Sequence, residues 1–181
     1  TEIAACRFID ALQAWTEECE VFAEDKNICR IAWGDASHRD KKKFDPHSEK
    51  YHGFGSCIDI RPIKKGSLEE FKAAHAEDPE LPLYLKRRDD YKNWITSSTD
   101  SYYDREMTRK LLAVLGEKGG HPIFFKDAVM EKEKGWKKNP TFKSVKGHAN
   151  HIHVCFPDTR ANREACENFR YRRSACGPLF Y

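Results

Sequence analysis

The chain has 181 residues, 34% of them charged and 39% hydrophobic, which is ordinary for a globular protein with one hydrophobic core. The net charge of +3 comes from 32 basic and 29 acidic residues that are interspersed along the chain. So mild a charge does not indicate binding to nucleic acid, and no apolar run approaches the roughly 18 residues of a membrane span. We therefore expect one domain over residues 1–181, with no nucleic-acid partner and no membrane span.

The first half of the chain predicts a long helix and two strands. Apolar residues recur at helical spacing over residues 3–22, which predicts an amphipathic opening helix. Residues 28–33 predict a strand, and the polar residues 38–51 predict an exposed loop. The alternating segment 56–63 predicts a second strand that Pro62 ends, and a capping box at Ser67 predicts a short helix that ends at Pro79.

The second half predicts the elements that complete an α+β fold. Residues 104–115 predict a helix capped by Asp104 and followed by glycines. Strands are expected at 121–127 and 151–156, and a last helix at 159–171. The mixed order leaves too few helical crossovers for a doubly wound sheet. We therefore predict the α+β class, with a small central antiparallel sheet and flanking helices.

Seven cysteines are many for a protein of a reducing compartment, and this number favours an oxidising one. None belongs to a Cys-x-x-Cys pair, which argues against a thiolate zinc knuckle. Cys166 and Cys176 flank a basic segment that a disulfide could close, and the odd count leaves at least one thiol unpaired.

Three histidines crowd into the stretch "GHANHIHVCF" of residues 147–156. In a strand over residues 151–156, alternate side chains point to opposite faces. One face then carries apolar residues and the other carries His151, His153 and Cys155. The strand at 57–61 divides in the same way, with Cys57 and Asp59 on the polar face.

A further histidine, His52, precedes that strand in "YHGFGSCID". Gly53 and Gly55 permit a turn or bulge that brings His52 over the face of Asp59. Two histidines and one carboxylate from three places form the ligand set of a catalytic zinc site, which keeps a fourth position for water. A pair of histidines on a strand can also be an ordinary surface feature, and it is the combination of both motifs that favours a metal.

The stretches "HGFGSCID" and "HANHIHV" together resemble the LAS-type zinc metallopeptidases, and most of all the penicillin-insensitive murein endopeptidases. The segments "GDASHR" at 34–39, "YDREMTRKLLAVL" and "IFFKD" are also similar, so the resemblance covers about residues 30–157. The opening helix, residues 1–24, and a C-terminal extension, residues 158–181, lie outside it. The resemblance implies the LAS or hedgehog-like metallopeptidase fold for the single domain.

The resemblance also implies roles for individual residues. His52, Asp59 and His153 would bind Zn²⁺. His151 would act as general base, and His148 would stabilise the oxyanion, with Arg39 contacting substrate or oxyanion. The dipeptidase branch has a glutamate base where this chain has Asn150, so the version with a histidine base is favoured. Where murein endopeptidases tend to have a histidine three residues before the first ligand, this chain has Glu49.

The implied function is hydrolysis of D-Ala-containing cross-links between peptidoglycan stem peptides, in the periplasm or outside the cell. DD-endopeptidase action is expected, with or without DD-carboxypeptidase action. The setting is open between a housekeeping enzyme, a lysin and a secreted antibacterial effector, which would have an immunity or carrier protein as partner. Two alternatives are a non-catalytic hedgehog-like zinc module and a metal-dependent nuclease or phosphoesterase.

One inference about the cysteines needs no family. If the two motif strands are adjacent and antiparallel, with Asp59 opposite His153, then Cys57 lies opposite Cys155. We expect the two sulfurs to be close, either as a disulfide or as two buried thiols, with a Cα separation of less than roughly 7 Å if they are bridged.

Overall fold

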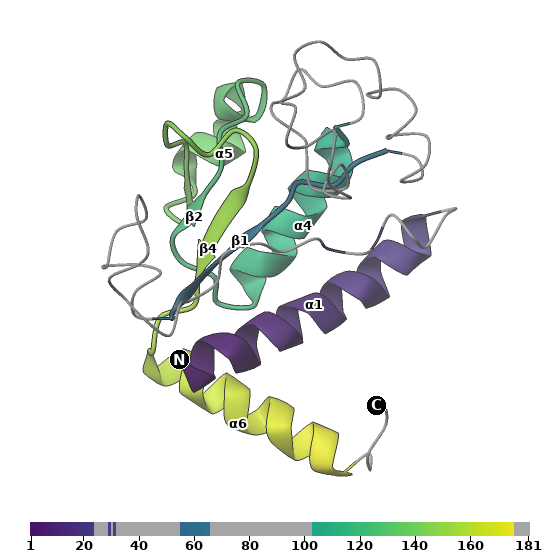
Figure 1. Cartoon of the computed structure of the whole chain (residues 1–181), viewed down its shortest axis with the longest axis vertical. Helices are drawn as coiled ribbons and strands as arrows, with labels where there is room; N and C mark the ends of the chain where they lie inside the picture. Colours follow the sequence, from purple (N-terminus) through teal and green to yellow (C-terminus); the bar gives the residue numbers. More distant parts are fainter. Residues whose placement is uncertain (24–28, 30, 32–54, 66–102, 176–181) are drawn as a thin grey trace, which may run out of the picture.

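A computed structural model describes residues 1–23, 29, 31, 55–65 and 103–175 of the chain (Figure 1). This described part has the predicted α+β class, because a four-stranded sheet is flanked by helices. Its elements are α1 (Glu2–Phe22), β1 (Cys57–Ile60), α4 (Arg105–Glu117), β2 (Ile123–Phe124), η5 (Met130–Lys132), α5 (Lys134–Lys138), β3 (Phe142–Lys143), β4 (Ile152–Cys155) and α6 (Arg160–Ala175). Within these ranges, no helix is both long and apolar enough to cross a bilayer.

The sheet is mixed rather than antiparallel throughout, which corrects the sequence-based expectation. Its strand order is β1-β4-β2-β3, and β4 pairs antiparallel with both β1 and β2. At the edge, β3 runs parallel to β2. Parallel neighbours need a long crossover connection, and the segment that contains η5 and α5 provides it. No strand was expected at 142–143, because two residues are too few to show alternation.

The long helices begin within one residue of their predicted starts, but α4 ends two residues after the predicted 115 and α6 four residues after the predicted 171. The side chain of Thr1 caps α1, and that of Asp104 accepts a hydrogen bond from the backbone N–H of Met107 at the start of α4. After α4, Gly119 takes a φ of +85° and the N–H of Gly120 donates to the carbonyl of Leu115, as in a Schellman motif. A Cβ on Gly120 would lie 2.8 Å from the side chain of Val154, so this glycine lets the end of α4 approach β4.

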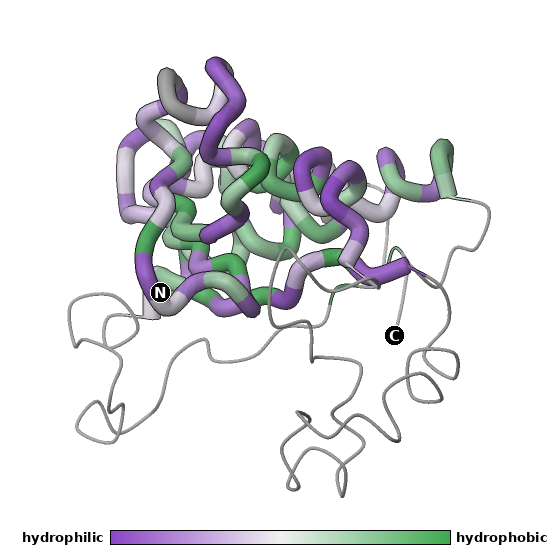
Figure 2. Tube along the Cα trace, turned by 90° about the horizontal axis from the view of Figure 1, so that it is seen from above, coloured by the Kyte–Doolittle hydropathy of each residue, from purple (hydrophilic) through white to green (hydrophobic). Residues whose placement is uncertain are grey.

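The core lies between the sheet and two helices, α1 and α4 (Figure 1). Hydrophobic positions alternate with hydrophilic ones along the helices and strands, as expected for elements that bury one side (Figure 2). The largest fully buried side chains come from all these elements: Trp15, Leu111, Leu112, Leu115, Ile60, Ile123, Phe125, Met130, Ile152 and Phe156. Because α1 contributes Trp15, this helix is part of the main core although it lies outside the family resemblance.

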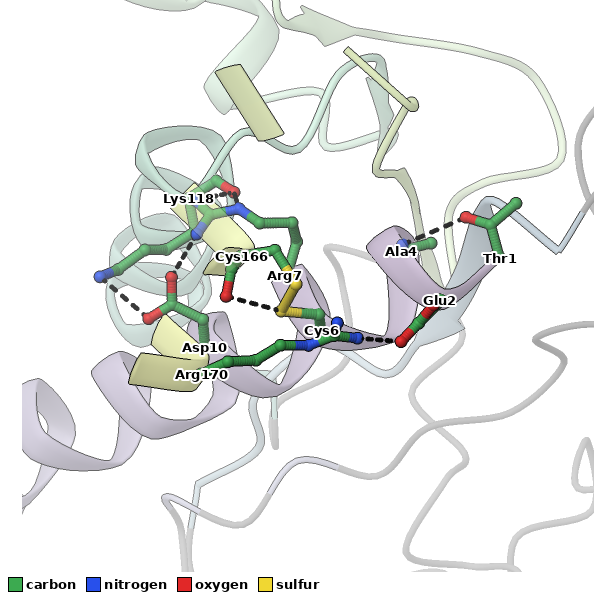
Figure 3. Close-up of a disulfide and its surroundings, with 9 residues drawn as sticks. All are labelled: Thr1, Glu2, Ala4, Cys6, Arg7, Asp10, Lys118, Cys166 and Arg170. Atoms are coloured by element: carbon green, nitrogen blue, oxygen red, sulfur yellow. Dashed lines mark hydrogen bonds and ion pairs between the residues drawn. A yellow bond between two sulfur atoms is a disulfide. The ribbon is translucent and has the colours of Figure 1, made fainter. Parts of the chain in front are cut away.

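Two disulfides anchor α1, one to a distant helix and one to a nearby residue. Cys6 is bonded to Cys166 of α6, and Cys19 is bonded to Cys29 (Figure 3 shows the first of these). The sequence allowed a bridge between Cys166 and Cys176, but Cys166 is bonded to Cys6 of α1 instead. Beside this bridge, the guanidinium of Arg7 donates to the backbone carbonyl of Lys118 at the end of α4. Three helices thus meet at one covalently fixed point.

Several predicted elements fall outside the described residues. The predicted loop at 38–51 and the predicted helix that starts at Ser67 are among them. Of the predicted strand at 28–33, only Cys29 and Ile31 are described, and neither lies in a strand.

A buried carboxylate organises the loop between β2 and η5. The side chain of Asp127 is fully buried and accepts hydrogen bonds from the Tyr103 hydroxyl at 2.8 Å and from Arg105 Nε at 2.9 Å. It also accepts from the backbone N–H groups of Val129 and Met130. Burial alone would raise the pKa of Asp127, but these four donors outweigh burial and lower it.

We expect Asp127→Ala to lower the free energy of unfolding by about 3–5 kcal/mol, because it leaves buried donors without their acceptor. Since the folded pKa lies below the unfolded value of 3.8, this carboxylate stabilises the fold above that pH, and the contribution is lost as the pH falls through the folded pKa. Urea denaturation at pH 7 and at pH 3 measures both effects. The matched control is Asp158→Ala, which removes an exposed carboxylate paired with Arg163 and should change stability little. Equal losses in the two variants would contradict this role for Asp127.

Candidate metal centre

Four side chains with metal-binding atoms form a square on one face of the sheet. In the antiparallel pairing of β1 with β4, Asp59 lies opposite His153 and Cys57 lies opposite Cys155. This is the register expected from the sequence. The other face of the same strands carries the core residues, because successive side chains of a strand alternate in direction. All four side chains on this polar face are buried, so protein atoms and not water surround them.

Asp59 and His153 are in direct contact. The Nδ1 atom of His153 lies 2.9 Å from Oδ1 of Asp59. A carboxylate oxygen only accepts, so the imidazole donates the proton in this contact. Ligand atoms at about 2.0–2.2 Å from a tetrahedral Zn²⁺ lie roughly 3.3 Å apart, so these two atoms have nearly the separation that one cation requires once it displaces the proton from Nδ1.

Phe124 of β2 fixes the orientation of the imidazole ring of His153. The two rings are stacked with an interplanar angle of 11° and centroids 5.4 Å apart. Phe124 also meets the ring of His148 edge-on, again at 5.4 Å. One aromatic ring therefore positions two of the histidines that the sequence analysis selected. No sequence pattern indicates this role, because Phe124 lies in a strand of only two residues.

His151 approaches Asp59 from the segment just before β4. Its Nε2 atom lies 3.9 Å from Oδ2 of Asp59, and its Nδ1 lies 2.8 Å from Oδ1 of Asn150. An amide oxygen can only accept, so this contact places the proton on Nδ1 and leaves a lone pair on Nε2. Arg61 donates to the backbone carbonyl of Asn150 at 3.2 Å, which ties this segment to the end of β1.

The environment keeps His151 neutral. Burial, which disfavours the cation, lowers the pKa of His151 to about 4, and the carboxylate of Asp59 only partly opposes this effect. A neutral imidazole with a bare Nε2 is the form that accepts a proton. The lone pair of Nε2 and the Asp59 carboxylate are both acceptors, so a cation or a proton donor binds favourably between them.

His148 completes the cluster of imidazoles. Its ring centroid lies 4.8 Å from that of His151 and 5.6 Å from that of His153. Burial lowers its pKa, and the nearby His153 acts in the same direction. Its Nδ1 atom is buried and has no well-aligned hydrogen-bond partner among the described residues, although backbone groups of Val145 and Lys146 lie near the ring. A buried polar atom without a partner is costly, which favours a ligand that would satisfy it.

Of the six predicted site residues, four lie together and two are outside the described part. Asp59, His153, His151 and His148 form the cluster above. The predicted ligand His52 and the predicted substrate contact Arg39 fall outside the described residues. Gly55, which the prediction required as a turn after His52, has a φ of +62°, a left-handed conformation that favours glycine.

The sulfurs of the square give a second set of possible ligands. Cys57 and Cys155 form a disulfide with a Cα separation of 3.9 Å, below the limit of roughly 7 Å expected for a bridged pair. Within the described ranges, Cys57, His153 and Cys155 offer ligand atoms that all lie within 4.8 Å of one another. A disulfide sulfur is a poor ligand compared with a thiolate. In the oxidised chain, Asp59 and His153 are therefore the better pair for a metal.

Comparisons of the chain with family models, with curated proteins and with solved structures give no match.

We expect His151 to titrate near pH 4 in the metal-free protein, because its pKa is lowered to about 4 mainly by burial. Two-dimensional NMR of the imidazole carbons against pH measures this value, and the His151→Ala variant assigns the resonance. A second variant, Arg61→Gln, removes a cationic side chain that helps to lower the pKa, so the midpoint should rise. A midpoint for His151 at the ordinary value of 6.5 would show that the imidazole is not desolvated in solution.

Proposed function

We propose that the protein is a zinc-dependent peptidoglycan peptidase that hydrolyses D-Ala-containing cross-links between stem peptides. The observation that carries the proposal is the contact of Asp59 with His153, together with the bare Nε2 of His151 at 3.9 Å from the same carboxylate. Two ligands and a neutral base are parts of a hydrolytic zinc site, which has three protein ligands and one position for water. The resemblance of the two motifs to murein endopeptidases supplies the substrate class.

Asp59 and His153 would hold the Zn²⁺ ion, and His52 is the proposed third ligand. When bound, Zn²⁺ would polarise the scissile carbonyl and lower the pKa of a water ligand towards about 7. His151 accepts a proton through Nε2 and returns it to the leaving amine, while Asn150 holds Nδ1 in the required tautomer. His148 donates to the developing oxyanion, and Arg39 is proposed to assist it.

Disulfides support a site of action outside the cytoplasm. The described part contains three of them, and such bonds persist in oxidising compartments. We therefore propose the periplasm or the extracellular space, where peptidoglycan is also found. If the protein is a secreted antibacterial effector, an immunity or carrier protein would be its partner.

A non-catalytic zinc module of the hedgehog type is the second candidate. Such a module needs metal ligands but no base. The oriented His151 beside Asp59 favours catalysis, because a purely structural site gains nothing from a neutral imidazole with its lone pair turned towards a ligand. A nuclease or phosphoesterase remains a third class, which plasmid and model phosphoester assays test directly.

Metal content gives the first test. We expect the purified protein to bind Zn²⁺ stoichiometrically, and Asp59→Ala and His153→Ala to lose it, because each removes a proposed ligand. Elemental analysis after dialysis measures the content. The matched control is His121→Ala, which removes an exposed imidazole but keeps the backbone N–H that donates to the carbonyl of Cys155, and it should retain the metal. The proposed metal centre would be refuted if the wild type binds no Zn²⁺ or if His121→Ala also loses its Zn²⁺.

Digestion of purified sacculi tests the chemistry. Wild type and His121→Ala should release uncross-linked muropeptides, and His151→Ala should be slower by about 10²–10⁴-fold, since general acid–base catalysis contributes that much. This variant should keep its Zn²⁺, which separates the loss of a base from the loss of a ligand. Chromatography and mass spectrometry of the muropeptides identify the bond that is cut. Identical profiles for zinc-loaded wild type and untreated sacculi would refute peptidase action on this substrate.

A further inference from the structure

The disulfide between Cys57 and Cys155 lies beside the proposed zinc ligands. His153, one of those ligands, also lies next to its sulfurs. The Nε2 atom of His153 lies 3.4 Å from Sγ of Cys155, while Nδ1 lies 2.9 Å from Oδ1 of Asp59. The two nitrogens of one imidazole therefore face two different sets of possible ligands. With the proton on Nδ1, the Nε2 atom presents its lone pair towards the sulfurs.

We propose that Cys57, Cys155 and His153 form a second metal site that exists only when their disulfide is reduced. Two thiolates and one imidazole are a known zinc ligand set that leaves a fourth position open. The site is distinct from the proposed catalytic centre in its sulfur ligands and in the nitrogen of His153 that it uses. It does not depend on the chain being a peptidase.

The chemistry of the switch balances with an external dithiol. The dithiol gives two electrons and two protons to the bond between the sulfurs of Cys57 and Cys155, and it becomes a disulfide itself. The chain gains two thiols. Binding of a divalent cation then releases the two thiol protons to solvent, because thiolates and not thiols are the ligands.

The positions of the strands suit this site without a large movement. The ligand atoms of Cys57, His153 and Cys155 lie within 4.8 Å of one another, and ligand atoms around a tetrahedral Zn²⁺ lie roughly 3.3–3.8 Å apart. Rotation of the cysteine side chains accounts for such a difference. The backbone of β1 stays paired with β4 through its hydrogen bonds, and Ile58, Ile60 and Val154 keep the opposite face in the core.

Burial and ligand type determine which cation fits. Cys57, Cys155 and His153 are each less than a tenth exposed, so water competes weakly for the cation. Thiolates are soft ligands and favour Zn²⁺ over Mg²⁺ or Ca²⁺. A cation held there engages His153 from its Nε2 side, while Nδ1 keeps its contact with Asp59. The reduced chain would thus carry zinc through sulfur rather than through the proposed catalytic ligands alone.

Co²⁺ absorption of the full chain tests the site, because cobalt bound by thiolates shows a sulfur-to-metal charge-transfer band. The protein is reduced with a dithiol, freed of reductant under anaerobic conditions and titrated with Co²⁺. We expect a strong band for wild type and its loss in Cys57→Ser/Cys155→Ser. The matched control, Cys19→Ser/Cys29→Ser, removes as many thiols elsewhere and should keep the band. No band in wild type, or equal bands in both double variants, would overturn the proposal.

Alkylation covers the case in which reduction or substitution loosens the fold. Zn²⁺ should slow the reaction of Cys57 and Cys155 with iodoacetamide in the reduced wild type, and mass spectrometry of the peptides reads each cysteine separately. Protection of Cys6 and Cys19 to the same extent would overturn the proposal. His153→Ala should lose the protection at Cys57 and Cys155, and protection that survives this substitution contradicts the role of the imidazole.

The oxidised protein separates this proposal from the peptidase. Co²⁺ bound without a sulfur band in the oxidised form reports on the proposed catalytic ligands, which include Asp59 and His153. If the oxidised form binds no Co²⁺ while the reduced form gives the band, the peptidase proposal fails and the thiolate site stands. The reverse result supports the peptidase centre and removes the thiolate site.

Discussion

The antiparallel register of β1 with β4 is the constraint on which the rest of the site depends. It pairs Asp59 with His153 and Cys57 with Cys155 in adjacent rows. A slip of one residue would turn every side chain of one strand to the opposite face, because the period of a strand is two. If β1 slipped in this way, Ile58 and Ile60 would leave the core while Asp59 entered it without a partner. The burial of the apolar face therefore fixes the register, and the register in turn brings the proposed ligands together.

Much of this could be predicted because it follows from local patterns. Alternation in two short segments predicted both faces of the strands, and simple arithmetic on the register placed Cys57 opposite Cys155. The opening helix and the cap at Asp104 also follow from periodicity and capping chemistry. The parallel strand β3 could not be predicted, since two residues have no periodicity. The bond from Cys6 to Cys166 spans 160 residues, and sequence spacing does not select among possible cysteine pairings.

The supporting contacts of the site were the least visible in the sequence. Phe124 stacks on His153, and Asn150 fixes the tautomer of His151. Neither residue has a chemical signature of its own, because any aromatic ring or side-chain oxygen in the right place would serve. In the sequence, Asn150 occupies the position at which the dipeptidase branch has its glutamate base. In the structure its amide oxygen lies 2.8 Å from Nδ1 of His151, the proposed base. The same residue therefore replaces the glutamate base and orients the histidine base.

The position of the disulfide reflects how little backbone supports the square of ligands. β1 and β4 have four residues each, so few ladder hydrogen bonds hold Asp59 against His153. A bond between Cys57 and Cys155 closes a chain segment of 98 residues, for which loss of chain entropy in the unfolded state predicts about 4–5 kcal/mol of stabilisation. This stabilisation acts one row from the proposed ligands, and it is independent of the helices that cover the other face. A buried carboxylate and imidazole carry a desolvation cost that favours their exposure to water. The covalent link at this place lets a small sheet keep the two groups buried and in contact.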